Sequence, residues 1–510
     1  MKQQMSFWMF GKFRKHKSDL SGEDLITVLP NKTRYPIYSF SEWYSDKWDA
    51  MDYGATYDEN KSFFQQLKYL QEKVPRPHQN GSNNVRCDYC DDVWDSKDCY
   101  LSRSMIGCEN IFYSYRNVNV KNSIDATVCF DCEKSFDISD CHNSYKLFYS
   151  KHSYDCIESS FLYDCRNCQN CFMSWNLRNK SYCIENIQYT KEEYKEKIKS
   201  FNLGSYKSIQ KYKKYFEEII KNKVVHRPNF NFRAYNSNGD YLIDVKNCQN
   251  SHTVSDSENF INCIRGVNIK DSIDFSGCSG ELLGNCSGCM YGYQEKYCSW
   301  STSRYSEYLD ISIDCEYCFG CVGLKKKKYC ILNKQYSKEE YESLKEKIIS
   351  DMRKNGEYGK FLPYEMSAGP FNFSTSFLYF PETKKEEILK LGGYWEEVDE
   401  SDIEGMPTSK LPDDIKDAPD DITKTALICP ETGWRFNIAP NELVFYRENN
   451  IPLPRKHFDI RTKEQLRYLT VLQAYPYKCF YCKKDTEAYY LPEWNYKNIA
   501  CEECYKQNIA

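Results

Sequence analysis

The sequence contains few histidines and no long apolar run, and both absences narrow what the protein can be. Histidine accounts for 7 of the 510 residues, so large histidine-ligated metal clusters are not expected. No apolar run approaches the ~20 residues needed to cross a bilayer, and the mean hydropathy is −0.74. Residues 1–17 are basic and aromatic but lack the apolar core and cleavage site of a signal peptide. We therefore expect a cytoplasmic protein with no membrane partner.

The sequence also lacks a strong excess of charge of either sign. Its formal net charge is −4, which is close to neutral for a chain of this size. Proteins that coat nucleic acids or bind anionic membranes usually carry a large positive charge. The charge balance therefore argues against both of these general roles.

Cysteine, in contrast, is abundant, with 27 residues. Disulfides need an oxidising compartment, and nothing in the sequence indicates export. An odd number of cysteines also fits a complete disulfide framework poorly. Metal ligation and packing are the explanations that stay open.

One long segment occurs twice, in residues 164–194 and 314–341. Each copy contains Cys-x2-Cys-x2-Cys, then Tyr-Cys-Ile, then Lys-Glu-Glu-Tyr at the expected start of a helix. The match is too long to be chance. The protein is therefore expected to be a tandem of two similar modules.

A short period runs through the region before each copy. All cysteines from Cys87 to Cys183 have numbers divisible by three, and similar Asn or Asp units recur every twelve residues, as at Asp98, Asn110 and Asn122. A fixed short period is typical of solenoids. Asn and Asp tolerate the left-handed backbone conformation at corners, and cysteine is small and readily buried.

We therefore predict a mainly β fold with helices, built on two tandem β-solenoid segments, 85–189 and 236–336. In this interpretation the cysteines of both segments face inward and act as packing residues. A metal cluster is the alternative, because Cys-x2-Cys-x2-Cys resembles part of a ferredoxin-type motif. The next cysteine is twelve or nine residues away and is followed by Ile, not Pro, which disfavours that cluster. The residues that an iron–sulfur or zinc site would use are Cys165, Cys168, Cys171, Cys315, Cys318 and Cys321.

Helices and linkers account for the segments between these regions. Residues 46–84 contain apolar positions at helical spacing that end at Pro75, followed by a linker. Residues 190–235 and 337–380 each begin with a capping box, Thr190-x2-Glu193 and Ser337-x2-Glu340, and continue into an extended tail. Residues 381–425 are acidic and rich in proline, which is typical of a surface linker.

The clearest chemical signal lies in residues 471–510. Cys479-x2-Cys482 and Cys501-x2-Cys504 are separated by eighteen residues. Four thiolates in this arrangement form the tetrahedral zinc site of a zinc ribbon, with no position left for water. We therefore expect one structural zinc ion that stabilises the fold. Redox use of the cysteine pairs is the alternative, but no thioredoxin-like βαβ context surrounds them.

The N-terminal residues 1–45 follow nearly the same frame without its ligands. Ser18, Ser21, Ser39 and Glu42 stand where the four cysteines would be. Serine hydroxyls do not replace thiolates on zinc. We predict a metal-free, ribbon-like module that is held together by packing.

The segment 426–470 is expected to be a small packed module of strands and helices. Cys429 has Thr432 at the position of its partner, so a zinc site is not supported. The segment is the most basic part of the C-terminal region. The candidates for contact with phosphate or a partner are Arg447, Arg455, Lys456 and Arg461.

The chain resembles a family of uncharacterised, cysteine-rich zinc-ribbon proteins that is common in Patescibacteria, the candidate phyla radiation. The resemblance covers most of the chain. Its motifs are Trp43–Asp49 with Asp52–Gly54, Val74–Arg76, the two cysteine triplets that end in Lys-Glu-Glu-Tyr, Glu442–Tyr446 with Pro452–Arg455, and the terminal ribbon. Some members are labelled as coenzyme A transferases, yet no residue here stands in a recognisable nucleophile context.

The resemblance implies several metal sites in other members, from which this sequence departs. In the segment 426–470 it implies ligand positions that are occupied here by Thr432, His457 and Ile460. It also implies that a further module before the equivalent of Met5 is missing or truncated in this sequence. Only Cys479, Cys482, Cys501 and Cys504 are carried over as a complete site.

These observations predict a non-catalytic zinc-ribbon repeat protein that acts as a binding or scaffold protein for a protein partner. Solenoids present long, regular faces, which suit an extended partner. A nucleic-acid- or ribosome-associated protein is one alternative, because zinc ribbons and arginine-rich loops often serve there. A redox or transferase enzyme that uses the clustered cysteines or the solenoid surface is another. No paired carboxylates or histidine-centred constellation supports an enzyme, and we assign no catalytic residue.

Overall fold

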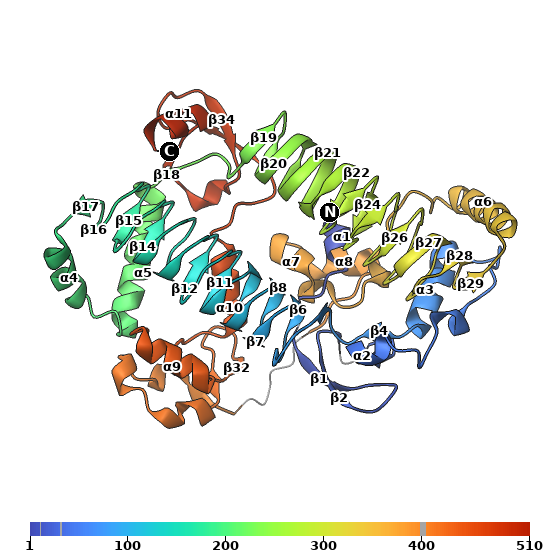
Figure 1. The fold of residues 1–510 in the computed structure, drawn as a ribbon, viewed down its shortest axis with the longest axis horizontal. Helices are drawn as coiled ribbons and strands as arrows, with labels where there is room; N and C mark the ends of the chain where they lie inside the picture. The colour runs from blue at the N-terminus through green and yellow to red at the C-terminus, as the bar shows by residue number, and fades with distance from the viewer. Residues whose placement is uncertain (11, 31–32, 398–403, 510) are drawn as a thin grey trace. The chain divides into compact units, whose positions relative to one another are not determined.

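The computed structural model describes residues 1–10, 12–30, 33–397 and 404–509 (Figure 1). The chain is mixed α/β, with about 33% strand and 24% helix. It divides into two compact units, Met1–Asn80 with Asn229–Glu397 and Gly81–Pro228 with Val398–Ala510. Each unit therefore combines one of the two repeat regions with segments from elsewhere in the sequence. Within the described residues, no helix has both the length and the apolar character that crossing a bilayer requires.

The unit that begins at Gly81 is built on a parallel sheet. The strands are β5 (Gly81–Ser82), β6 (Asp91–Trp94), β7 (Lys97–Tyr100), β8 (Arg103–Ile106), β9 (Glu109–Phe112), β10 (Tyr115–Val118), β11 (Lys121–Thr127), β12 (Phe136–Ser139), β13 (Tyr145–Phe148), β14 (Ile157–Tyr163), β15 (Phe172–Trp175), β16 (Cys183–Ile184) and β17 (Ile187–Gln188). Tyr115 pairs with both Arg103 and Thr127, so neighbouring strands are offset by twelve residues. This register confirms the twelve-residue period of the sequence. The last pair, β16 and β17, is antiparallel and ends the sheet.

The unit that contains the N-terminus has a second sheet of the same kind. Its strands are β19 (Phe232–Tyr235), β20 (Gly239–Gln249), β21 (Ser251–Val267), β22 (Ile269–Ser276), β23 (Gly280–Glu281), β24 (Gly284–Ser287), β25 (Gly292–Tyr293), β26 (Thr302–Arg304), β27 (Ile313–Phe319), β28 (Lys328–Ile331) and β29 (Lys334–Gln335). Leu242 pairs with Val254 at the twelve-residue offset. Ile269 pairs with Gly280, an offset of eleven residues. Steps of this kind explain why the period is less regular in this half of the sequence.

Within each twelve-residue repeat the backbone follows a three-residue pattern. In the first sheet, Asn110, Tyr113 and Arg116 all have positive φ, and the residue after each of them is fully or almost fully buried. The left-handed residue turns the chain, and the next residue then points inward. Asn and Asp occupy many of these left-handed positions because they tolerate this conformation better than other side chains with a Cβ. The cysteines at numbers divisible by three are therefore inward-facing residues.

Small polar side chains satisfy the backbone inside both sheets. Ser135, which is fully buried, donates through Oγ to the carbonyl of Glu133 and accepts from the backbone N–H of Leu147 one repeat later. Cysteine takes the same position elsewhere, since Cys278 Sγ accepts from the N–H of Cys289 at 3.2 Å. A buried N–H without an acceptor would destabilise the fold. Buried serine and cysteine thus provide hydrogen-bond acceptors for buried amides of both sheets.

The helices after each sheet begin where the sequence predicts. Helix α4 (Lys191–Lys199) has Thr190 as its cap and Glu193 as the reciprocal partner, and α6 (Lys338–Lys354) has Ser337 and Glu340. These contacts confirm both predicted capping boxes. Helix α5 (Tyr206–Asn222) follows α4 and buries Phe216 and Ile219 against its own unit.

The N-terminal segments fold onto the second repeat region. They comprise α1 (Lys2–Met5), β1 (Arg14–Lys17), β2 (Asp24–Thr27), β3 (Ile37–Tyr38), α2 (Phe40–Trp43), α3 (Phe63–Lys73) and β4 (Arg76–Pro77). Helix α3 confirms the helix predicted before Pro75. Its Phe63 packs against Tyr308 and Phe319 of the sheet, with ring centroids 5.4 and 5.2 Å apart. Helices α7 (Thr375–Tyr379) and α8 (Lys385–Lys390) complete this unit.

The C-terminal segments fold onto the first repeat region. They comprise β30 (Met406–Pro407), β31 (Leu427–Ile428), β32 (Arg435–Phe436), α9 (Pro440–Glu448), α10 (Phe458–Leu466), β33 (Tyr475–Lys478), β34 (Asp485–Ala488), β35 (Asn498–Ile499) and α11 (Glu502–Asn508). Strand β35 pairs with β18 (Val225–His226), which follows α5. Part of the expected linker 381–425, residues 398–403, lies outside the described residues. Farther along that stretch, Leu411, Ile415 and Ile422 are buried in the core of this unit. These residues are therefore packed, although the sequence suggested a surface linker.

Candidate metal centre and basic pocket

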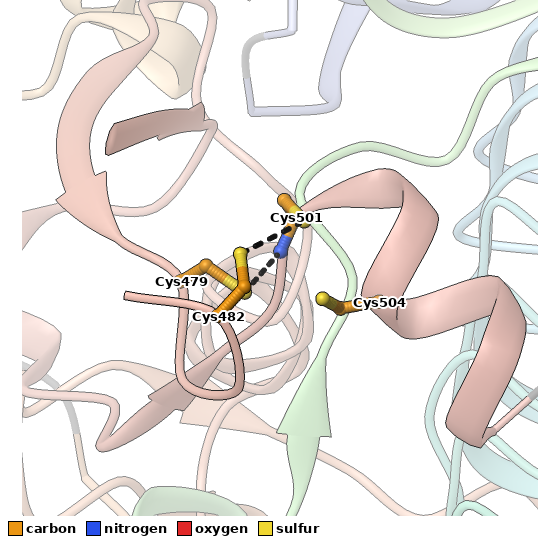
Figure 2. Close-up of side chains that lie close together, drawn as sticks. All are labelled: Cys479, Cys482, Cys501 and Cys504. Atoms are coloured by element: carbon orange, nitrogen blue, oxygen red, sulfur yellow. Dashed lines mark hydrogen bonds between the residues drawn. The ribbon is translucent and has the colours of Figure 1, made fainter. Parts of the chain in front are cut away.

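Four cysteines converge near the C-terminus. Cys479 and Cys482 lie in the turn between β33 and β34, Cys501 caps α11, and Cys504 lies in its first turn. Their four sulfur atoms all lie within 4.8 Å of one another, and Figure 2 shows the side chains meeting from the turn and the helix. This arrangement is suited to one metal ion with four protein ligands.

The backbone lowers the pKa of Cys479, whereas hydrogen bonding with the sulfur of Cys501 raises the pKa of Cys504 to about 12. The N–H of Cys501 donates to Cys479 Sγ at 3.2 Å, and Cys482 Sγ lies 3.9 Å from Cys501 Sγ. Burial raises the pKa of Cys479, but the backbone N–H groups of Cys501, Cys482 and Tyr481 outweigh it and lower the pKa to about 6. Thiolate is the form of cysteine that binds metal. The donor set therefore fits a soft divalent cation such as zinc.

One strand pair connects the cluster to the rest of its unit. Strand β35, which leads into Cys501, pairs with β18. The N–H of Ala500 donates to the carbonyl of His226 at 2.9 Å. Cys479 is fully buried, whereas Cys482 is exposed. A metal ion at this point would join the turn, the helix and the β18–β35 pair.

The turn at Cys479 occurs at two other places in the chain. The N–H of Cys479 donates to the carbonyl of Lys484, and the N–H of Lys483 donates back to the Cys479 carbonyl. Ser18 makes the equivalent pair of bonds with Glu23 and Gly22, and Cys429 makes it with Trp434 and Gly433. Lys483, Gly22 and Gly433 all have positive φ. The same backbone turn is therefore present in residues 1–45 and 426–470, where cysteine ligands are missing.

At the Ser18 turn the carboxylate of Glu42 accepts hydrogen bonds from the residues that stand at the ligand positions. Glu42 Oε2 accepts from the hydroxyl of Ser18 at 2.5 Å and from the N–H of Ser39 at 2.9 Å. Burial raises the pKa of Glu42, but hydrogen bonds from the serines outweigh it and lower the pKa to about 2. Ser18 and Ser39 are thus connected to Glu42 by hydrogen bonds to one buried carboxylate. Ser21 takes part in the same stabilisation of the carboxylate.

At the second turn the position of Cys479 is occupied by Cys429, which is buried. Burial raises its pKa, but hydrogen bonds from the backbone of His457 and from the hydroxyl of Thr432 lower the pKa overall. Ile460 packs against the core of its unit. The contacts of His457 and Thr432 with Cys429 bring three of the four positions implied by the resemblance together.

The cysteine triplets of the repeat regions are placed differently. Cys165, Cys168 and Cys171 are buried at successive inward positions, and each sulfur donates to the carbonyl two residues earlier. Cys315, Cys318 and Cys321 repeat this pattern. Among the described residues, only the C-terminal four cysteines form a group whose ligand atoms lie within 4.8 Å of one another.

The basic residues predicted to contact phosphate separate into two places. Arg455, Lys456 and Arg461 line one cavity of about 320 Å³ in their unit. Arg447 lies outside this cavity and donates to Asp420 and to the carbonyl of Ala418. The sequence could not show that Lys151, Lys213 and Lys214 line the same cavity, because they are more than two hundred residues away.

Comparison with known proteins does not assign the chain to a family. No family model matches the chain, and no curated protein matches it. Among solved structures, a protein from Desulfovibrio desulfuricans G20 described as a putative acetyltransferase is similar at 11% identity. The similarity covers 55% of this chain and 79% of that one, with a TM-score of 0.10. A likeness this distant carries no argument about function.

Proposed function

We propose that the protein is a non-catalytic binding scaffold of two β-solenoids, stabilised by one structural zinc ion at Cys479, Cys482, Cys501 and Cys504. The convergence of these four sulfur atoms is the observation that carries the proposal. Four cysteine ligands occupy all four coordination positions of a tetrahedral zinc ion and leave none for water or substrate. The ion therefore holds the fold together and takes no part in a reaction.

The twelve-residue register of both sheets supports the solenoid interpretation. Each repeat stacks on the next through backbone bonds, while serine and cysteine fill the interior. The related turns at Ser18 and Cys429 support ribbon-like modules that keep their shape without metal. In this proposal the modules close the sides of the solenoids and leave other faces available to a partner.

A row of tyrosines provides one such face in the N-terminal unit. Tyr293, Tyr305, Tyr317 and Tyr329 contact one another in sequence, with ring centroids 4.8 to 5.4 Å apart. Tyr305 is 36% exposed. Tyrosine provides a rigid apolar surface with a polar edge and is enriched at protein interfaces. The row is therefore the part of the solenoid best suited to an extended protein partner.

Metal analysis of the purified chain tests the structural zinc. Protein prepared without added metal should contain one zinc per chain. Cys501→Ser should lose it, because one of four ligands is removed, and Cys168→Ser should keep it. Stoichiometric iron, or several zinc ions that survive in Cys501→Ser, would refute the proposal.

The binding role requires a separate test. The full chain should crosslink to a defined protein in cells, and Tyr305→Ser with Tyr317→Ser should abolish that crosslink. Tyr69→Ser is the matched control, because Tyr69 is 60% exposed in the same unit but lies outside the row. If the Tyr305→Ser, Tyr317→Ser double variant recovers as much partner as Tyr69→Ser, the tyrosine row is not the binding face.

A further inference from the structure

The cavity that contains Arg455 and Arg461 has the features of a small-molecule site. We call it the α5–α10 pocket, because these two helices form its walls together with residues 452–456 and residues of strands β11, β12 and β14. All of these elements belong to one unit. Its volume of about 320 Å³ is at the lower end of the range typical of ligand pockets.

The interior of the pocket is apolar and its walls are charged. Phe136, Tyr149, Phe161 and Phe216 are buried beneath it. Seven Lys and Arg side chains line it against four Asp and Glu side chains. This excess of positive charge on an aromatic base favours an anionic ligand with an apolar or sugar-like body.

Several of the cations are held in place by buried carboxylates. Asp137 accepts from Lys151 at 2.8 Å and from Lys213 at 2.5 Å. Asp125 pairs with Arg461. Burial raises the pKa of Asp137, but Lys151 and Lys213 outweigh it and keep the carboxyl charged. These pairs fix the positions of the cations before any ligand binds, which reduces the entropy lost on binding.

The hydrogen bonding of the pocket is incomplete. Within the described residues, Asp125 Oδ1, Arg455 Nε and Arg461 Nε are buried without a partner. Asp125 is 2% exposed. Most buried polar atoms are bonded, so these three atoms can bond to a molecule that fills the cavity. The ligand must accept hydrogen bonds from two guanidinium groups and offer a donor to a carboxylate.

Lys214 adds one free charge at the rim. It is exposed on α5 and lines the pocket, and the described part of the chain provides no ion pair for it. Arg455 lies over the ring of Tyr206 at 4.2 Å, which orients its guanidinium. Arginine and lysine are the usual side chains that bind phosphate.

We propose that the α5–α10 pocket binds a small organic phosphate of the sugar-phosphate class. Arg455 and Arg461 hold the phosphate, and Lys214 closes over it. A hydroxyl of the same ligand donates to Asp125. This site goes beyond the zinc-stabilised scaffold and does not depend on it, because none of its residues is a metal ligand.

Asp125 makes the affinity depend on pH. Burial raises its pKa to about 7, with Asp137 and Glu442 acting in the same direction and Arg461 and Lys213 opposing them. At pH 6, below this pKa, most of the carboxyl is neutral and repels an anion less. A hydroxyl can bond either form of the group. An anionic ligand should therefore bind more tightly at pH 6 than at pH 8.

Calorimetric titration of the full chain at physiological salt tests the proposal. Glucose 6-phosphate is the probe, with glucose and inorganic phosphate as its two halves. We expect glucose 6-phosphate to bind at least about tenfold more tightly than either half, because it engages both the cations and Asp125. The absence of binding at millimolar concentrations, or equal affinity for inorganic phosphate, would overturn the proposal.

Variants locate the site. Lys214→Met should weaken binding about tenfold, the order of one charge-assisted hydrogen bond. Lys211→Met is its matched control, because Lys211 is exposed on the same helix but does not line the pocket. An equal effect of the two variants would mean that binding depends only on the charge of α5, and the site would be rejected.

The pH dependence provides an independent readout. Glucose 6-sulfate keeps a constant charge across this range, so any change in its affinity arises from the protein. Its affinity should increase several-fold from about pH 8 to about pH 6, and Asp125→Asn should remove the increase. An unchanged pH profile in Asp125→Asn would show that Asp125 does not face the ligand.

Discussion

The hydroxyl of Ser18 donates a 2.5 Å hydrogen bond to the carboxylate of Glu42. In the ribbon-like frame that the sequence predicts, these two residues occupy two of the cysteine positions. The carboxylate also accepts from the backbone of Ser39. The same carboxylate completes the capping box of α2. One buried charge thus joins the turn after β1 to the start of a helix, which is the connection that a metal ion would provide.

Replacing Glu42 should therefore destabilise the N-terminal unit. Glu42→Ala removes the acceptor of the Ser18 hydroxyl and of the Ser39 N–H, and hydrogen bonds to a charged group contribute about 1.5–3 kcal/mol each. We expect the free energy of unfolding to fall by about 3 kcal/mol, measured by urea denaturation followed by tryptophan fluorescence. Glu23→Ala is the control, because Glu23 is exposed beside the same turn. Equal loss in both variants would contradict the role of Glu42.

The contribution of Glu42 should also disappear in acid. Its pKa in the folded protein is lowered to about 2 from an ordinary value of 4.5. A carboxyl of this kind stabilises the fold above its unfolded pKa and loses that contribution as the pH falls toward its folded pKa. The difference in stability between the protein and Glu42→Gln should therefore shrink from pH 5 to pH 2. A constant difference over this range would mean that the carboxylate charge is not involved.

The repeats and caps of this fold could be predicted because they are local. Cysteines at positions whose numbers are divisible by three indicate which side chains face inward. Thr190 and Glu193 mark the start of α4 within four residues of sequence. The pairing of distant segments could not be predicted in this way. Phe63 signals a buried helix face, but nothing in its neighbourhood indicates that it packs against Tyr308.

The candidate sites follow the same division. The four cysteines of the C-terminal cluster form two short motifs, so spacing alone identifies them. The α5–α10 pocket joins Asp125 to Arg461 across more than three hundred residues. The sequence shows Arg455 and Arg461 as part of a basic stretch. That Asp125 and the lysines of α5 lie beside them depends on tertiary packing, which the sequence does not show.

Metal removal should loosen a defined part of the C-terminal unit. Strand β35 leads directly into Cys501, and its pairing with β18 is short. Chelation of the ion should therefore increase the rate of amide hydrogen exchange at Ala500, which bonds to His226. The amide of Leu147, inside the first sheet, should stay protected and serves as the internal control. Protection that survives chelation at both amides would show that the ion does not stabilise this pair.

The interior serines should be necessary as hydrogen-bond acceptors. Ser135→Ala leaves the N–H of Leu147 buried without its acceptor, at a cost of about 1–3 kcal/mol. Ser135→Cys should cost less, because Cys278 already accepts an equivalent bond elsewhere in the chain. Thermal unfolding of the two variants measures the difference. If the alanine and cysteine variants are equally stable, the interior is held by packing alone.

A buried ion pair should anchor the N-terminal segments to the second repeat region. Arg76 pairs with Asp310, which also accepts from Gln71 at 2.6 Å, and the side chain of Asp310 is 1% exposed. Asp310→Asn leaves the guanidinium of Arg76 buried without its counter-charge. Removing one partner of a buried pair typically costs about 3–5 kcal/mol, so urea denaturation should show a loss of this size.

The control for this pair is an exposed one in the same unit. Lys17 and Asp24 pair across the β1–β2 hairpin with side chains that are 71% and 87% exposed. Asp24→Asn should change the stability little, because solvent screens such pairs. Replacing Arg76 and Asp310 together by Met and Leu should recover part of the loss, since no buried charge is then left alone. If Asp310→Asn is as mild as Asp24→Asn, the docking of these segments depends on the aromatic contacts of α3, and Phe63→Ala becomes the more damaging change.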